Sequence, residues 1–283
     1  MTVIVGLLVG LVTVRFLRIV SGEILASPTL LRRNYRDHVL PTAGGLFIIL
    51  AVLLIEAGRS VFGAIGIGAQ PGLTEARTAV LFAVFGFGFL GLVDDLAAVG
   101  SDRGFRGHLG ALREGRVTTG MLKLVAGAGV AVVLVATPGF KSGRTLIVDA
   151  MLIALAANLG NLLDRAPGRT IKFGLVAYVP IAIVIGTAPI GIAIAPVIGA
   201  SVGLLGDDLR ERLMLGDTGA NVIGAVLGLA VVLGSRDSIR LVVMLVLLGL
   251  NVAAELVSFS RVIDAVPPLR AFDQLGRRRS RTR

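Results

Sequence analysis

The sequence predicts an all-α protein: a polytopic membrane helix bundle of about nine transmembrane helices. Hydrophobic residues make up 55% of the 283 positions, and the mean hydropathy of +0.89 lies far above that of an ordinary soluble domain. Apolar stretches suited to spanning a bilayer, which takes about 20 residues per helix, recur along the whole chain. No long polar segment separates them, so we expect one bundle rather than a soluble domain on an anchor.

The apolar stretches follow one another with short breaks. The first is followed by no cleavage site, so we interpret it as an uncleaved helix rather than a signal peptide. Only Gly186 to Pro189 separates the sixth stretch from the seventh, which makes this hairpin the least defined boundary. The predicted helices lie at about 1–20, 43–58, 78–98, 119–138, 145–163, 172–187, 189–206, 218–235 and 238–258.

A basic tail follows the last stretch and divides the chain into a transmembrane domain, 1–260, and a tail, 261–283. Apolar residues recur in the tail at three- and four-residue spacing among arginines. This pattern suits an amphipathic segment on an anionic leaflet, broken at Pro267–Pro268. A frayed tail that only fixes the topology also explains it.

The distribution of basic residues predicts the orientation. Of the 28 lysines and arginines, 22 fall in one set of loops. Only six fall in the other set: Arg59, Arg77, Lys141, Arg144, Arg236 and Arg240. Because cytoplasmic loops are enriched in Lys and Arg, we expect an outer N-terminus and a cytoplasmic C-terminus in the cell membrane. The net charge of +10 is then explained by these loops rather than by nucleic acid, and the absence of cysteine excludes disulfides and thiolate metal sites.

Charged side chains near membrane depth are costly, about 2.5–3.5 kcal/mol each on insertion scales, so each needs a reason. Asp94 and Asp95 end the third predicted helix directly behind a long apolar run. Neighbouring helical residues point about 100° apart. One carboxylate could therefore take a metal while the other orients or deprotonates a substrate; the alternative is a pair of solvated helix-end acids.

Asn158, Asn161 and Asp164 recur at a spacing of three, which places them on one helix face. Amide and carboxylate oxygens are ligands that Mg²⁺ accepts, and amides also bind phosphates or sugars. An interhelical hydrogen-bond seam explains the same pattern.

Glycine-flanked Asp217 opens the eighth predicted helix, whose first N–H groups could bind a phosphate while the carboxylate holds the cation. The alternative is a helix N-cap. Gly44 and Gly45 lead into the second helix and could cradle a phosphate or form a turn. Lys123, one turn inside the fourth helix, suits a lipid phosphate, although such a lysine also commonly extends to the surface. All these residues fall on loops or helix ends assigned to the cytoplasmic side, so together they predict a Mg²⁺–diphosphate site that opens onto the membrane.

In these motifs the chain resembles the polyprenyl-phosphate N-acetylhexosamine-1-phosphate transferase family. The resemblance covers nearly the whole chain in order: Pro41–Leu46, Asp94–Asp95, Lys123, Asn158–Asp164 and Gly216–Ala220. It implies transfer of a sugar-1-phosphate from a UDP-amino sugar to a polyprenyl phosphate at the cytoplasmic leaflet, with Mg²⁺ and release of UMP, for synthesis of the cell envelope. It leaves a homodimer open.

The resemblance also implies residue roles. Asp217, together with Asp94, would hold Mg²⁺, and the pair Asp94–Asp95 would activate or position the lipid phosphate. Lys123 would contact phosphate, and the remaining residues would line the site: Asn158, Asn161 and Asp164.

The chain departs from the family where the nucleotide sugar is expected. Family members usually continue Asp-Gly-x-Asp-Gly after the asparagine strip, where this chain has Pro167 at the second acidic position. The histidine-containing late loop has no counterpart, and relatives often have ten helices. The segment instead supplies Arg165, Arg169 and Lys172, so we expect these cations to hold the donor diphosphate, unless they are ordinary positive-inside residues.

Two other classes of function share some of these sequence features. A non-catalytic relative that binds polyprenyl phosphate as a scaffold would share the motifs but release no UMP. A transporter with an acidic ion path would carry its acids near helix centres, whereas here they gather at one face.

Overall fold

The computed structural model describes residues 2–68, 72–97, 119–136 and 143–278. Within these ranges it holds eleven α-helices, a two-stranded hairpin and two short 3-10 turns, Gly22–Ala26 and Pro28–Leu30. The expected all-α membrane bundle is confirmed. The long helices are α1 (Val3–Val20), α2 (Leu46–Ala64), α3 (Glu75–Ala97), α5 (Thr119–Val135), α6 (Gly143–Leu163), α7 (Arg169–Ile185), α8 (Pro189–Leu209), α9 (Gly216–Gly234) and α10 (Asp237–Leu256).

Each of the nine predicted stretches coincides with one of these helices. Seven of them are long and apolar enough to cross a membrane, counted over the described residues. The other two, α5 and α7, are 17 residues long, and α7 contains Pro180. The hairpin between α7 and α8 exists: α7 ends at Ile185, and the next residue, Gly186, turns the chain with a φ of +48° before Pro189 begins α8.

Helix α9 is the centre of the bundle. It packs against α3, α6, α7 and α8, while α1 packs on the outside of α8. Small residues allow these backbones to approach: a Cβ on Gly199 would lie 2.0 Å from the carbonyl oxygen of Leu7, and one on Gly224 would lie 2.2 Å from that of Ala156. Such close contact of backbones is the usual way in which membrane helices pack, because lipid offers no hydrophobic driving force between them.

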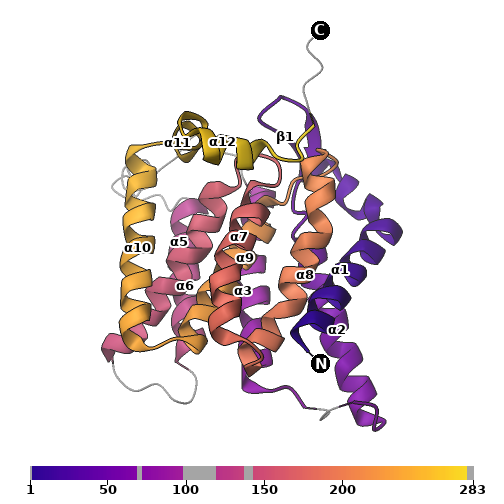
Figure 1. Cartoon of the computed structure of the whole chain (residues 1–283). Coiled ribbons are helices and arrows are strands. Elements are labelled where there is room, and N and C mark those ends of the chain that lie inside the picture. Colours follow the sequence, from indigo (N-terminus) through magenta and orange to yellow (C-terminus); the bar gives the residue numbers. More distant parts are fainter. Residues whose placement is uncertain (1, 69–71, 98–118, 137–142, 279–283) are drawn as a thin grey trace.

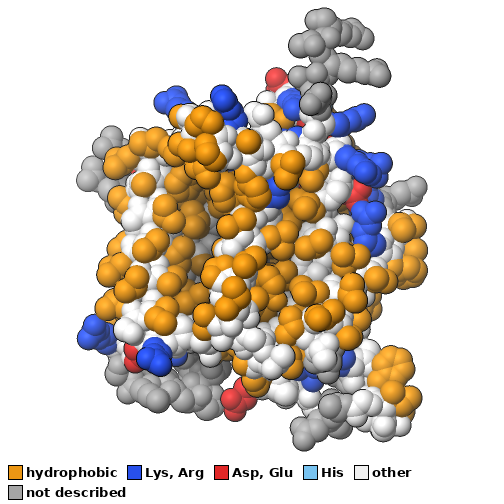
Figure 2. Space-filling model, viewed as in Figure 1, with side chains coloured by type: hydrophobic (Ala, Val, Ile, Leu, Met, Phe, Trp, Pro, Cys, Tyr) orange, Lys and Arg blue, Asp and Glu red, His pale blue; other side chains and the backbone are white. Residues whose placement is uncertain are grey.

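Polar structure gathers at the two ends of the bundle. Figure 2 shows a broad hydrophobic surface between ends where charged side chains appear. At one end lie the hairpin β1–β2 (Leu31–Arg33 and Val39–Pro41) and the short helices α11 (Phe259–Ala265) and α12 (Pro267–Gln274), as seen in Figure 1. We call this the hairpin end; the C-terminal segment leaves from it, and the N-terminus lies towards the other end.

Ion pairs stabilise the other end. Arg77 donates from Nε to Glu56 at 2.6 Å, and both side chains are buried between α2 and α3. Arg59 pairs with the same carboxylate at 2.9 Å. Arg240 of α10 pairs with buried Asp149 of α6 at 2.9 Å. Three of the six basic residues on this side therefore have acidic partners, which reduces the cost of placing them at the membrane boundary.

Helices α11 and α12 turn the predicted tail into part of the fold. The break falls where the sequence indicated it, because Pro267 begins α12 after α11 ends at Ala265. Asp273 is 1% exposed and lies against the start of α7. The segment that we expected to be a separate tail is thus docked on the bundle at least as far as the end of α12.

Candidate active site

Asp95 fixes the start of α9. Its carboxylate accepts hydrogen bonds from the backbone N–H groups of Asp217 at 3.2 Å and Thr218 at 3.0 Å, and from the Thr218 hydroxyl at 2.6 Å. The Thr42 hydroxyl donates a fourth, at 3.1 Å. The first N–H groups of a helix have no partner inside the helix, so an acceptor from another helix stabilises them. Asp95 therefore joins α3, the β2–α2 turn and the first turn of α9, which carries Asp217.

Glycines make this junction possible. A Cβ on Gly45 would lie 2.1 Å from Cα of Gly219, and one on Gly216, whose φ is +72°, would lie 2.6 Å from a carboxylate oxygen of Asp95. The N–H groups of Gly44 and Gly45 donate to the carbonyls of Met214 and Leu215 at 3.0 and 2.9 Å. In this arrangement the glycine pair serves close packing, and its N–H groups are used inside the protein rather than turned towards a phosphate.

The asparagine strip divides between two partners. Asn161 donates from Nδ2 to Asp217 at 3.0 Å, so α6 and α9 hold this carboxylate together. Asn158 instead donates to Oδ1 of Asn251 on α10 at 2.7 Å. The structure thus brings Asn161 and Asp217 together, whereas Asn158 forms the interhelical seam that was the alternative explanation.

Asp164 lies in an acidic environment just after α6. Burial raises the pKa of Asp164 well above the ordinary range, and the charges of Asp208, Asp217 and Asp95 raise it further. A hydrogen bond from the Thr170 hydroxyl at 3.3 Å offsets this only in part. Asp208 is itself buried at the end of α8, where it accepts the N–H of Gly168 at 2.9 Å. We call these four side chains the carboxylate cluster: Asp95, Asp164, Asp208 and Asp217.

The cluster suits a divalent cation electrostatically. Like charges that raise one another's pKa are relieved by a bound cation, and carboxylate oxygens are the ligands Mg²⁺ prefers. Among the described residues, no three His, Cys, Asp or Glu side chains form a group able to hold a metal by themselves. Mg²⁺ is usually bound by one or two carboxylates together with water and substrate phosphates. Asp94 lies half-buried one residue before Asp95, at the same end.

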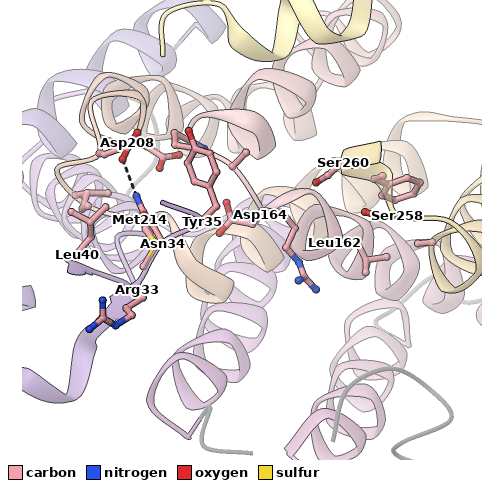
Figure 3. A pocket seen from close by; sticks show the side chains of 17 residues that line it. Arg33, Asn34, Tyr35, Leu40, Leu162, Asp164, Asp208, Met214, Ser258 and Ser260 are labelled. Atoms are coloured by element: carbon pink, nitrogen blue, oxygen red, sulfur yellow. Dashed lines mark hydrogen bonds between the residues drawn. The ribbon is translucent and has the colours of Figure 1, made fainter. Parts of the chain in front are cut away.

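A cavity of about 700 Å³ opens beside the cluster. Figure 3 shows Asp164 near its centre, with Arg33 and Asn34 of the hairpin on one side and Ser258 and Ser260 on the other. Glu211 holds the hairpin there. Its carboxylate accepts a hydrogen bond from Nδ2 of Asn34 at 2.8 Å and forms an ion pair with Arg36, also at 2.8 Å. We call this space the acidic cavity.

Two of the expected donor ligands are committed elsewhere. Arg169 is 3% exposed and binds Asp273 through two parallel hydrogen bonds of 2.9 Å, with a third, of 2.8 Å, to Ser260. Lys172 donates to the carbonyls of Phe272, Asp273 and Leu275 at 2.5 to 3.2 Å, at the C-terminal end of α12. In the described structure both side chains attach α12 to α7. That Arg169 and Lys172 also hold the donor diphosphate stays a prediction.

Lys123 belongs to α5, but its side chain lies outside the part of the structure that is described. Sequence reasoning also missed residues that the structure brings to the site. They are Glu211, which pairs with Arg36, and Asp208, which accepts the N–H of Gly168. His38 is exposed, and its Nδ1 lies 3.2 Å from Glu211. The available signal was the density of acids at the end of α8 and just after it: Asp207, Asp208 and Glu211.

Comparison with known proteins supports the resemblance seen in the motifs. The chain is 31% identical over 195 residues to the phospho-N-acetylmuramoyl-pentapeptide-transferase of Deinococcus radiodurans, which covers 66% of the chain and 59% of that protein. It is 26% identical over 235 residues to the enzyme of that name from Desulforudis audaxviator (75% and 67% covered) and 26% over 279 residues to that of Rhodopseudomonas palustris (83% and 72% covered). The chain thus spans about three-fifths of the length of the first of these relatives. No family model matches it.

Proposed function

We propose that this chain, which its curated relatives support as a divergent member of the phospho-N-acetylmuramoyl-pentapeptide-transferase family, transfers a sugar-1-phosphate from a UDP-sugar to a polyprenyl phosphate. UMP is the second product, and the lipid-linked sugar serves synthesis of the cell envelope. The cytoplasmic leaflet is the proposed location, on the distribution of basic residues along the sequence.

The observation that carries this proposal is the carboxylate cluster beside the acidic cavity. Four acidic side chains from α3, the end of α6, α8 and α9 converge at the hairpin end, where burial and mutual repulsion raise the pKa of Asp164. Keeping four carboxylates together near membrane depth is costly. A site that binds a cation and a diphosphate gives a reason for that cost.

Asp217 and Asp164 are the residues we assign to the cation, with Asp94 as the third candidate. Asn161 orients Asp217 through its 3.0 Å hydrogen bond, and Asp95 holds the first turn of α9 in place. When bound, Mg²⁺ would neutralise the charge on the diphosphate and on the departing UMP.

The reaction itself requires little from a protein base. An oxygen of the lipid phosphate, already ionised, attacks the phosphorus that carries the sugar, and the bond from that phosphorus to the oxygen of UMP breaks. UMP leaves with the electron pair of that bond. The chain therefore contributes mainly by positioning the two substrates and by excluding water. Lys123 stays our candidate for a contact to the lipid phosphate.

The proposal is tested with purified protein, undecaprenyl phosphate and Mg²⁺, incubated with a panel of UDP-sugars. We expect UMP release from at least one UDP-sugar, dependent on both the lipid and the metal. Release of no UMP from any of them, by protein that still binds undecaprenyl phosphate, would instead favour a non-catalytic lipid-phosphate-binding protein.

One observation favours that second candidate. Pro167 replaces an acidic residue of the family motif, and the side chains of Arg169 and Lys172 bind groups of α12. The nucleotide-sugar part of the site has therefore changed more than the part assigned to the lipid.

A further inference from the structure

A second cavity adjoins the acidic one at the hairpin end. It measures about 980 Å³ and lies between the hairpin, the α6–α7 turn and α12. The two cavities share four lining residues, so they form one continuous groove: Tyr35, Arg165, Ala166 and Ser260.

The groove changes sign along its length. The acidic cavity is lined by three acids and two arginines, whereas the second cavity is lined by five arginines and a single acid, Asp264. The acids of the first cavity are Asp164, Asp208 and Glu211, and its arginines are Arg33 and Arg165. We call the second one the basic cavity; its arginines are Arg36, Arg165, Arg169, Arg277 and Arg278.

Most of these arginines already have an acidic partner. Arg36 pairs with Glu211 at 2.8 Å, while Arg169 and Arg277 both pair with Asp273, at 2.9 and 2.5 Å. The side chain of Arg165 makes no hydrogen bond or ion pair with any described residue, although it lines both cavities and is exposed. It stands next to Asp164 in the sequence, at the point where the acidic wall meets the basic one.

An unpaired guanidinium at this place is suited to phosphate. A guanidinium is always charged, and its fork of N–H groups matches two phosphate oxygens. A diphosphate with its cation presents positive charge on one side and free phosphate oxygens on the other. The carboxylate cluster complements the first and Arg165 the second.

We propose that Arg165 binds a substrate phosphate at the junction of the two cavities. Of the three cations that the sequence suggested for this role, Arg165, Arg169 and Lys172, it is Arg165 that the structure leaves available for it. This inference rests on the proposed function and names the residue that recognises the phosphate. The phosphate belongs either to the nucleotide sugar or to the lipid acceptor, and binding measurements separate these two sources.

The experiment uses the full chain in lipid nanodiscs and measures the dissociation constants of UDP, with uridine as the phosphate-free reference, and of undecaprenyl phosphate. Arg165→Ala is compared with Arg165→Lys and with the control Arg210→Ala. Arg210 is also an exposed arginine, just after α8, that lines neither cavity and whose side chain makes no hydrogen bond or ion pair with the described residues.

We expect Arg165→Ala to weaken UDP binding about tenfold, as loss of a charge-assisted bond does, with a smaller loss in the lysine variant and none in the control. Weakened binding of undecaprenyl phosphate alone would assign the same site to the acceptor. Unchanged binding of both ligands by Arg165→Ala would overturn the inference and leave the proposed function intact. If the wild type binds neither ligand, the proposed function fails and the inference fails with it.

Discussion

The attachment of α12 to α7 gives the sharpest prediction for stability. The carboxylate of Asp273 receives both Arg169 and Arg277, and it is 1% exposed. Replacing it by asparagine preserves its shape but removes its charge and one of the two oxygens that accept from Arg169. The guanidinium of Arg169, 3% exposed, then stays buried without the charge of Asp273. Breaking one side of a buried ion pair costs about 3–5 kcal/mol, because the other charge stays buried.

This cost is expected to appear as local opening. Lys172 holds only backbone carbonyls of the same segment, so it cannot keep α12 in place once the carboxylate pairing is lost. In Asp273→Asn we expect amide hydrogen exchange over residues 259–278 to become markedly faster while α9 keeps its protection. Asp264→Asn is the matched control, because Asp264 is an exposed acid of the same segment and should change stability by less than about 0.5 kcal/mol.

Replacing both partners refines the test. Arg169→Leu combined with Asp273→Asn removes the buried charge along with its partner, so we expect the double variant to recover part of the stability that Asp273→Asn loses. Exchange in Asp273→Asn no faster than in the Asp264→Asn control would refute the reasoning, since it would mean that the apolar contacts of α11 and α12 hold the segment without the ion pair.

Four further predictions follow from the site and the fold. Gly45→Ala should destabilise the protein by about 1–3 kcal/mol or more, because its Cβ would lie 2.1 Å from backbone atoms of the first turn of α9, whereas Gly58→Ala, with nothing within 4 Å, should be tolerated in thermal unfolding. Asp217→Asn should abolish turnover with unchanged helix content by circular dichroism; retained turnover at saturating Mg²⁺ would remove Asp217 from the cation site. Burial alone would raise the pKa of Asp273, but the hydrogen bond from Arg169 and the charges of Arg169 and Arg277 hold it below the ordinary value. The stability it supplies should therefore be fully present above the ordinary carboxyl pKa and be lost in acid as pH falls through the lowered pKa, which exchange over α12 as a function of pH would show. A reporter fused after Arg283 should be active only in the cytoplasm, and activity outside would reverse the assigned orientation.

Hydropathy and motif order predicted much of the molecule. Nine apolar stretches became nine helices because burial in lipid depends on local composition, which the sequence displays directly. The approach of Asp217 to Asn161 could also be predicted from the sequence, because both lie at helix ends assigned to the same side.

The partners of the basic residues could not be predicted from the sequence in this way. Arg169 stands in the motif region, but its partner Asp273 lies 104 residues further along the chain, in a segment whose apolar spacing suggested contact with lipid. The partners of Asp95 could not be predicted either, because its four hydrogen-bond donors come from two turns that only the folded backbone brings together. Local patterns identify a charged residue at membrane depth, whereas its partner is set by tertiary packing.

The central claim, phosphoryl transfer from a UDP-sugar to a polyprenyl phosphate, is tested most directly by following a label. UDP-sugar labelled on the phosphate that carries the sugar is mixed with the nanodisc-embedded protein, undecaprenyl phosphate and Mg²⁺, and the lipid is then extracted. We predict that the label moves into the lipid fraction together with stoichiometric UMP, and that chelation of the metal stops both. A label that stays entirely in the aqueous fraction, for every UDP-sugar tried and with the lipid demonstrably bound, would contradict the account.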